Sequence, residues 1–323
     1  MRIADKMAYL AGALLFVAAP LVLCAEEGSG GETAPAVACL PPADNTACSA
    51  THGQEGPQDA QAESAEPRWG ISRFLPAWMA MAESTEAQQP NWLSPVATTS
   101  GRLKQEFRYD SWRQPGAAGG SVYNFGGGKG LEFVVAPRVQ LMVGVPPYTL
   151  PTQAGTDSGF GDLPLMLKAR LFARPQGEGD SLLTFLLGAT IPVGDPLYGN
   201  GMPVLSPALA FGKGKGKLDV QGTIGGNFPV GADAKLGRQV ISNTAVQYHA
   251  VRLLWPECEV NATFYESGKN AGKKQVFLTP GLGFGRVRLR GRLSLSLGAG
   301  VQIAATRFHT YNHRAIVSLR LSF

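Results

Sequence analysis

The chain has 323 residues, a net charge of +5 and a mean hydropathy of −0.02, values that resemble those of a soluble protein. After the first 25 residues no uninterrupted apolar stretch approaches the ~20 residues that a spanning helix needs, so the composition excludes a helical membrane protein. The charge is unevenly placed, because from Pro67 onward 27 Lys and Arg face 15 Asp and Glu, a net of +12.

The first residues predict export from the cytoplasm. Arg2 and Lys6 precede the apolar run Met7–Leu23, which is the order of a secretory signal peptide, and we place that peptide at residues 1–25. Cys24 leaves a lipoprotein alternative open, although lipidation sites usually carry a smaller residue than leucine just before the cysteine. Export would deliver the chain to the bacterial cell envelope.

An acidic linker is predicted at residues 26–67. Between Glu26 and Glu66 the chain holds eight carboxylates, no Lys or Arg, and no aromatic residue. Such a segment cannot bury enough apolar surface to offset its ordering entropy, so we expect disorder. Cys39 and Cys48 could close a small loop in an oxidising compartment.

A pre-barrel segment, residues 68–92, follows on the predicted periplasmic side. We expect a short amphipathic helix that lies at the membrane surface or under the barrel, and Pro76 would kink or end it. A collapsed apolar patch is the alternative. Within Arg68–Ala82 the residues at helical spacing are Ile71, Phe74, Leu75, Trp78 and Met79.

Alternating segments fill the rest of the chain, from Leu93 to Phe323. In each of them apolar side chains take every second position, so one face of a strand is apolar and the other polar. This pattern is typical of barrels that turn one face to lipid and the other to a polar lumen. We count twelve segments, at residues 101–110, 131–135, 138–145, 162–172, 181–191, 203–211, 218–228, 239–250, 254–265, 275–286, 292–303 and 313–323.

The connections between these segments alternate in length. Outer-membrane barrels have long outer loops, short periplasmic turns and an even strand number. With both ends in the periplasm, twelve strands reproduce this asymmetry, which a soluble sandwich, the alternative for alternating strands, does not require. The longer connections are 111–130, 146–161, 192–202, 229–238, 266–274 and 304–312, and the shorter ones are 136–137, 173–180, 212–217, 251–253 and 287–291.

The last nine residues look like the closing strand of a bacterial outer-membrane barrel. Every second residue from Ala315 to Phe323 is apolar, Ile316 is the only mismatch, and the final residue is aromatic. We therefore predict an all-β fold, a transmembrane, antiparallel, up-and-down β-barrel of about 12 strands that occupies residues 93–323.

Aromatic residues and glycines complete the predicted barrel. Gly281, Gly283 and Gly285 share one face of a segment and would leave space in the lumen. Aromatic side chains near strand ends would form the girdles at the membrane interfaces, and these are Tyr109, Trp112, Tyr148, Tyr198, Trp255, Tyr265 and Tyr311.

Charged residues on the polar faces are the candidates for the lumen lining. Confined charges focus a field and select permeants by sign, and the basic excess favours anions. The alternative is that acids and bases pair and fill the lumen, because about eight strands make a solid barrel and ~16–18 leave a water channel. The candidates are Arg102, Lys104, Glu106, Arg108, Asp162, Lys168, Arg170, Asp219, Glu257, Glu259, Arg292 and Arg320.

Enzyme chemistry is not indicated. No GxSxG elbow occurs, Gly126–Gly130 lacks the Ser or Thr that follows a P-loop lysine, and the four histidines show no zinc spacing. We expect no catalytic residue, cofactor or metal. A barrel lipase is the alternative, and its Ser–His pairs would be Ser242 with His249 or Ser318 with His313.

Three stretches, Trp92–Tyr109, Gly159–Lys168 and Leu187–Gly194, carry a family resemblance. Through them, residues 93–323 resemble the outer-membrane proteins grouped with the MetA pathway of phenol degradation. The resemblance implies a barrel channel, associated in some members with the uptake of aromatic compounds. It implies no catalytic or binding residue for this chain.

These features together predict a porin-like channel of the bacterial outer membrane for passive passage of small molecules, with aromatic or hydrophobic compounds suggested by the resemblance. A closed structural barrel that presents loops or docks a periplasmic partner is the alternative. Expected partners are outer-membrane lipid and lipopolysaccharide, a small-molecule permeant, and the barrel-assembly machinery, which would meet the strand that ends at Phe323. Nucleic acid is not expected, because no basic helix or stacking platform is visible.

Overall fold

The chain divides into two units, Met1–Trp69 and Gly70–Phe323, and the structure describes the second. The predicted signal peptide, the acidic linker, Cys39 and Cys48 lie outside the described residues, all of which belong to the second unit. The structure, a computed structural model, describes residues 71–116, 119–127, 129–231 and 236–323.

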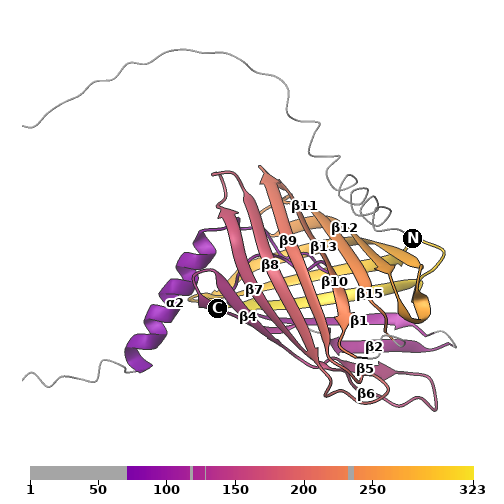
Figure 1. Cartoon of the computed structure of the whole chain (residues 1–323). Helices are drawn as coiled ribbons and strands as arrows, with labels where there is room; N and C mark the ends of the chain where they lie inside the picture. The colour runs from indigo at the N-terminus through magenta and orange to yellow at the C-terminus, as the bar shows by residue number, and fades with distance from the viewer. Residues whose placement is uncertain (1–70, 117–118, 128, 232–235) are drawn as a thin grey trace, which may run out of the picture. The chain divides into compact units, whose positions relative to one another are not determined.

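The second unit consists of strands preceded by a helix, α2 (Ile71–Ala87) (Figure 1). The strand segments are β1 (Glu106–Pro115), β2 (Ser121–Gly126), β3 (Gly130–Ala136), β4 (Val139–Gly144), β5 (Tyr148–Pro151), β6 (Gly159–Phe160), β7 (Leu163–Arg174), β8 (Ser181–Ile191), β9 (Val204–Lys215), β10 (Leu218–Pro229), β11 (Gln239–Tyr248), β12 (Leu254–Tyr265), β13 (Lys274–Arg290), β14 (Leu293–Ala304) and β15 (His313–Ser322).

These segments form one closed antiparallel β-barrel of twelve strands. The sheet contains 15 segments, and β15 also pairs with β1, which closes it. Three barrel strands are interrupted and consist of two segments each. The first is β2 with β3, which both pair with β1. The second is β4 with β5, which pair with β3 and β2, and the third is β6 with β7, which pair with β5 and β4. Each of these pairs makes one strand of the barrel, so the predicted fold class and the strand number are confirmed.

Alternation sorts the side chains between the two sides of the barrel wall. In β15, Val317 is 55% exposed, whereas Ser318 and Arg320 are 0% exposed and face the lumen. A soluble monomer rarely exposes apolar surface on this scale, and a bilayer accepts it. The large apolar residues that point outward include Leu167, Leu187, Leu209, Val246, Val260, Leu282 and Leu297.

The first strand differs from the predicted one. β1 begins at Glu106 rather than residue 101, because Glu106 already pairs with Ser322 at the end of β15 and leaves residues 101–105 without a strand partner. Leu103, which the alternation placed on the lipid face, is instead fully buried against Ala82 and Val134.

The interrupted strands make two outer loops much shorter than predicted. The strand segments β2 (121–126) and β5 (148–151) lie within the predicted loops 111–130 and 146–161, and β1 extends into the first of these loops as far as Pro115. The breaks fall at glycine-rich residues 127–129 and at Pro146–Pro147, where Gly127 has φ +56° and the prolines cannot donate to the ladder. The alternation therefore stops at each break although the barrel strand continues.

Four of the predicted girdle aromatics face the lumen. Trp255 and Tyr265 are each 8% exposed and lie on the polar, inward face of β12. Trp112 and Tyr311 lie on either side of the Arg314 guanidinium, whose carbon is 3.9 Å from each ring centroid. The girdle prediction is wrong for these residues because proximity to a strand end does not say which face a side chain occupies.

The helix α2 packs on the end of the barrel where β1 begins and β15 ends, which we call the terminal rim (Figure 1). Trp78 donates from Nε1 to the carbonyl of Val134 at 2.6 Å, and Thr85 donates to that of Pro137 at 3.2 Å. The helix continues through Pro76 because the residues after it are strong helix formers. Within the part of the chain that the structure describes, no helix combines the length and the apolar character that a membrane crossing requires.

Candidate functional site

Residues 88–105, which connect α2 to β1 and are called the inner segment below, occupy the lumen as a loop. Most of them are buried. The two ends of the loop lie side by side, because the Gln89 amide donates to the carbonyl of Leu103 at 2.6 Å and accepts from its N–H at 3.0 Å. The loop therefore enters and leaves the barrel at the terminal rim.

Two glutamates of β12 hold the tip of the inner segment. Glu257 accepts a hydrogen bond from the N–H of Val96 at 2.9 Å. Glu259, which is 0% exposed, accepts one from Ala97 at 2.7 Å and another from Thr98 at 2.6 Å, one on each carboxylate oxygen. Charged acceptors make the stronger class of hydrogen bond, so these carboxylates fix the tip in the middle of the barrel.

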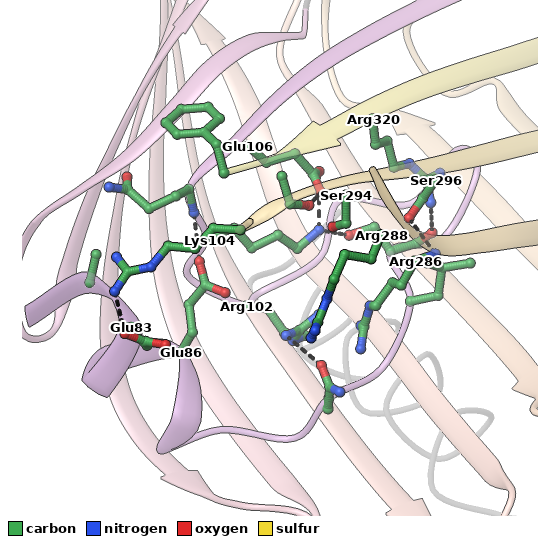
Figure 2. A pocket seen from close by; sticks show the side chains of 18 of the residues that line it. Glu83, Glu86, Arg102, Lys104, Glu106, Arg286, Arg288, Ser294, Ser296 and Arg320 are labelled. Atoms are coloured by element: carbon green, nitrogen blue, oxygen red, sulfur yellow. Dashed lines mark hydrogen bonds and ion pairs between the residues drawn. The ribbon is translucent and has the colours of Figure 1, made fainter. Parts of the chain in front are cut away.

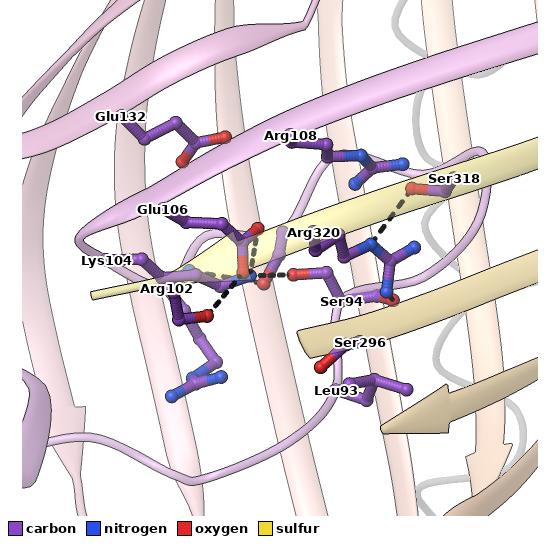
Figure 3. Close-up of polar contacts among 12 residues, drawn as sticks. Leu93, Ser94, Arg102, Lys104, Glu106, Arg108, Glu132, Ser296, Ser318 and Arg320 are labelled. Atoms are coloured by element: carbon purple, nitrogen blue, oxygen red, sulfur yellow. Dashed lines mark hydrogen bonds and ion pairs between the residues drawn. The ribbon is translucent and has the colours of Figure 1, made fainter. Parts of the chain in front are cut away.

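Two arginines of the wall, Arg108 and Arg320, both labelled in Figure 3, bind backbone carbonyls of the same stretch. Arg320 of β15 donates to Ser94 at 2.5 Å and to Pro95 at 3.0 Å. Arg108 of β1 donates to Val96 at 2.6 Å and forms an ion pair with Asp110 at 2.8 Å. The wall therefore satisfies both the donors and the acceptors of the inner segment, as burial of a backbone requires.

Uncharged polar side chains complete the contact between wall and inner segment. The Gln221 amide of β10 donates to the carbonyl of Leu93 at 2.9 Å, and its oxygen accepts from Ser100 at 2.9 Å. Thr184 of β8 donates to Gly101 at 2.7 Å. Strands on all sides of the barrel thus contribute to one binding surface for a peptide.

Lumen-facing glycines receive the apolar side chains of the inner segment. A Cβ atom at Gly212 would lie 2.4 Å from the Trp92 ring, and one at Gly283 would lie 2.3 Å from Leu93. A Cβ at Gly298 would lie 3.1 Å from Val96. The wall is therefore shaped to this loop, and the space predicted beside Gly283 is filled by it.

The structure places the sequence-predicted candidates in four settings. Arg102 and Lys104 belong to the inner segment rather than to a strand, and Arg292 lies exposed in the turn before β14, where it pairs with Glu83 at 2.8 Å. Asp162, between β6 and β7, accepts from the N–H groups of Gly194 and Asn200. The others are buried on the inward face of the wall: Glu106, Arg108, Lys168, Arg170, Asp219, Glu257, Glu259 and Arg320.

Part of this charge is paired. Lys168 and Glu132 form an ion pair at 2.8 Å, and Lys104 and Glu106 form one at 3.2 Å. Burial lowers the pKa of Lys104, which lies outside the strands, to about 7, because the loss of hydration outweighs the attraction of Glu106. Pairs of this kind match the alternative in which acids and bases fill the lumen.

Sequence reasoning missed several residues of the site. Gln221 and Gln140, which accepts from the N–H of Lys104 at 2.5 Å, carry no charge and are therefore not among the predicted candidates, although both occupy polar positions of alternating strands. Arg286, predicted as the last residue of the segment 275–286, lies within β13 at an irregularity between Gly285 and Val287, with a φ of +64°. No simple sequence signal marks such a bulge, which turns the Arg286 side chain inward to donate to the carbonyl of Trp92.

A cavity of about 450 Å³ lies at the terminal rim, between α2, the inner segment and the ends of β13 and β14 (Figure 2). Its basic lining residues are Arg102, Lys104, Arg286, Arg288, Arg292 and Arg320. Its acidic lining residues are Glu83, Glu86 and Glu106, and its apolar ones include Met79, Leu93 and Phe323.

The predicted Ser–His alternatives find no support in the contacts of Ser318, whose hydroxyl donates to Asp110 and accepts from Arg320. Among the described residues, no group of three or more His, Cys, Asp or Glu side chains could hold a metal ion.

Comparison with known proteins identifies no family for this chain. No protein-family model and no curated protein matches it, so the MetA-pathway grouping stays a prediction. Among solved structures, an outer membrane channel from Pseudomonas putida F1 is similar at 12% identity and a TM-score of 0.49, over 72% of this chain and 100% of that one.

Proposed function

We propose that this protein is a channel of the bacterial outer membrane for passive passage of small molecules, closed by its inner segment in the state described here. The observation that carries the proposal is a lumen whose wall is polar and whose filling is a hydrogen-bonded loop. Outer-membrane barrels with polar interiors are either water-filled or closed by a plug of this type. The inner segment is such a plug.

The contacts of the plug favour reversible closure. Its backbone is bound by Glu259, Arg320 and Gln221 rather than by a packed apolar core. Water can replace each of these bonds, and the net cost is limited to about 0.5–1.5 kcal/mol for a neutral pair and about 1.5–3 kcal/mol where one partner is charged. Because both ends of the loop lie at the terminal rim, it can withdraw without being threaded through the barrel.

The aromatic side chains that lie in the lumen beyond the plug favour passage of aromatic or hydrophobic solutes. Toward the rim opposite the terminal rim, Phe277 and Tyr311 stack with ring centroids 4.4 Å apart, and Tyr311 and Trp112 flank Arg314. Flat rings in a lumen offer stacking surfaces to planar solutes. Passage of such solutes, in the direction of the periplasm, is part of the proposal.

The apolar exterior and the strand order support the location. The terminal rim carries the short turns, at residues 137–138, 216–217 and 291–292, which in outer-membrane barrels face the periplasm. Export by the predicted signal peptide, contact with lipid and lipopolysaccharide, and recognition of β15 by the assembly machinery belong to the same proposal.

Planar-bilayer conductance and solute entry into liposomes test the channel. The comparison variant replaces residues 91–101 by two glycines and keeps Gln89 and Leu103, whose hydrogen bonds close the base of the loop. We expect rare openings from the natural protein and large, steady currents from the variant.

The alternative is a closed structural barrel. If the plug-deleted variant folds into a heat-modifiable barrel but neither conducts nor speeds solute entry, the channel proposal is wrong and this alternative stands. An uncharged loop deletion on the other rim, residues 154–156, is the control and should leave the currents of the natural protein unchanged.

A further inference from the structure

The cavity at the terminal rim combines basic groups with an apolar wall. Figure 2 shows Arg102, Arg286 and Arg288 converging on it from the inner segment and from β13. Its volume of about 450 Å³ falls within the range of about 300–1,000 Å³ typical of small-molecule sites.

Three arginines of this cavity, Arg102, Arg286 and Arg288, form no direct ion pair with a described carboxylate, whereas Arg292 is paired with Glu83. Arg286 donates to the carbonyl of Trp92, and Arg102 donates to the same carbonyl and to the side-chain oxygen of Asn91. Carbonyls accept hydrogen bonds but carry no compensating charge. For Arg288, the described residues offer neither a hydrogen bond nor an ion pair.

One buried donor in the lining has no acceptor. Arg102 is 5% exposed, and its Nε has no hydrogen-bond partner. A buried donor without a partner is destabilising, so native structures rarely keep one without a reason. An anion in the cavity is the group that such a donor lacks.

The backbone is strained where it directs a second arginine to the same place. Arg286 has a φ of +64°, a left-handed conformation that non-glycine residues rarely adopt because it is sterically strained. The strain positions its side chain beside Arg102, which adds repulsion between like charges. Both costs are explained if the two arginines share an anionic ligand.

The nearby carboxylates are already engaged. Glu83 pairs with Arg292, Glu106 pairs with Lys104, and Glu86 accepts from the N–H of Gln105 at 2.7 Å. The apolar part of the lining, including Met79 and Phe323, gives a ligand body something to contact. A purely inorganic anion would leave that surface unused.

We propose that this cavity binds a small organic carboxylate, with its charged group at Arg102, Arg286 and Arg288 and its apolar body toward Met79 and Phe323. The inference deepens the proposed function, because it names the class of solute that the channel releases at its periplasmic end.

A binding measurement tests this site independently of transport. Fluorine NMR would monitor the binding of 4-fluorobenzoate to the purified full-length protein in detergent. We expect 4-fluorobenzoate to bind and 4-fluorobenzyl alcohol, which has the same ring without the charge, to bind at least tenfold more weakly. Arg288→Gln removes a group with no partner, so the barrel should fold normally and the affinity should fall about three- to tenfold.

Controls separate the outcomes. Arg290→Gln removes the same charge from the same strand outside the cavity and should leave the affinity unchanged, and Arg288→Lys should retain most of it. The proposal is overturned if the alcohol binds as tightly as the carboxylate, if inorganic phosphate binds more tightly, or if Arg290→Gln weakens binding as much as Arg288→Gln. Binding of 4-fluorobenzoate without conductance by the plug-deleted variant would refute the proposed channel function but support the carboxylate site. Conductance without binding would refute the carboxylate site alone.

Discussion

Substitution of Glu259 by Gln tests whether the plug is held by the charged wall. Each carboxylate oxygen of Glu259 accepts one backbone N–H, from Ala97 at 2.7 Å and from Thr98 at 2.6 Å. A glutamine keeps one acceptor, but its NH₂ group would face the second N–H, donor against donor. The closed state alone loses this interaction, because in the open state water solvates either side chain.

The magnitude follows from these two contacts. A hydrogen bond to a charged group contributes about 1.5–3 kcal/mol, and the neutral amide recovers part of that because it is cheaper to bury. We expect a net shift of about 2 kcal/mol toward the open state, which is roughly a 30-fold change in the equilibrium between closed and open channels.

Single-channel recording in planar bilayers measures that equilibrium as the open probability. Glu259→Gln should raise it roughly 30-fold, and Glu178→Gln, which removes an exposed carboxylate from the turn between β7 and β8, should leave it unchanged. Heat-modifiable migration on a gel shows that both variants fold. A folded Glu259→Gln channel with the open probability of the natural protein would refute the reasoning.

Three further changes probe other parts of the structure. Gly283→Ala would place a Cβ 2.3 Å from Leu93, an overpacking that costs about 1–3 kcal/mol. Hydrogen exchange of residues 88–105 should accelerate in this variant, and the added change Leu93→Ala should restore protection. Unchanged exchange in Gly283→Ala would contradict the close fit between wall and plug. Lys168→Met leaves Glu132 buried without its ion-pair partner, so the free energy of unfolding, measured from the urea midpoint, should fall by about 3–5 kcal/mol, and a second change, Glu132→Met, should largely recover it. Equal losses of stability in the single and double variants would argue against a stabilising ion pair. Trp78→Phe removes the 2.6 Å hydrogen bond to Val134, worth about 1 kcal/mol, and should speed proteolysis within α2; Phe74→Ala, at an exposed site, should not, and identical cleavage of both variants would disprove this anchor.

Alternation in the sequence predicts the regular strands closely. The predicted spans 181–191 and 254–265 coincide with β8 and β12. In β12 the alternation is uninterrupted from Pro256 to Phe264, because one face meets lipid and the other the lumen, whereas β8 also carries Leu182 and Leu186 on its inward face. In these strands the prediction succeeds because the environment that it assumes, lipid on one face and lumen on the other, is the one that the structure shows.

Alternation mispredicts segments in which apolar and polar residues alternate for a reason other than lipid on one face and lumen on the other. Residues 101–105 alternate as well as β1 does, yet they lie inside the barrel, where Arg102 and Lys104 meet polar groups and Leu103 packs against Ala82. Alternation says which side chains share a face but not what that face contacts. At residues 127–129 and Pro146–Pro147 it is interrupted although the barrel strand continues.

The candidate site was predictable only in part. Charged residues at inward positions, such as Glu259 and Arg320, follow from the two-residue period. The plug does not, because the alternating segments begin only at residue 101 and nothing in the sequence before them marks Trp92, Leu93 and Val96 as the side chains that Gly212, Gly283 and Gly298 receive. Which glycine receives which side chain depends on contacts between distant parts of the chain.

A reversible cross-link between plug and wall tests the central claim most directly. With the 4 native cysteines replaced, Val96→Cys and Gly298→Cys would form a disulfide, because a Cβ at position 298 lies 3.1 Å from the Val96 side chain. We predict that the oxidised protein forms this bond and shows no channel openings in a planar bilayer, and that reduction restores them. Equal conductance in the oxidised, cross-linked state and the reduced state would contradict the account.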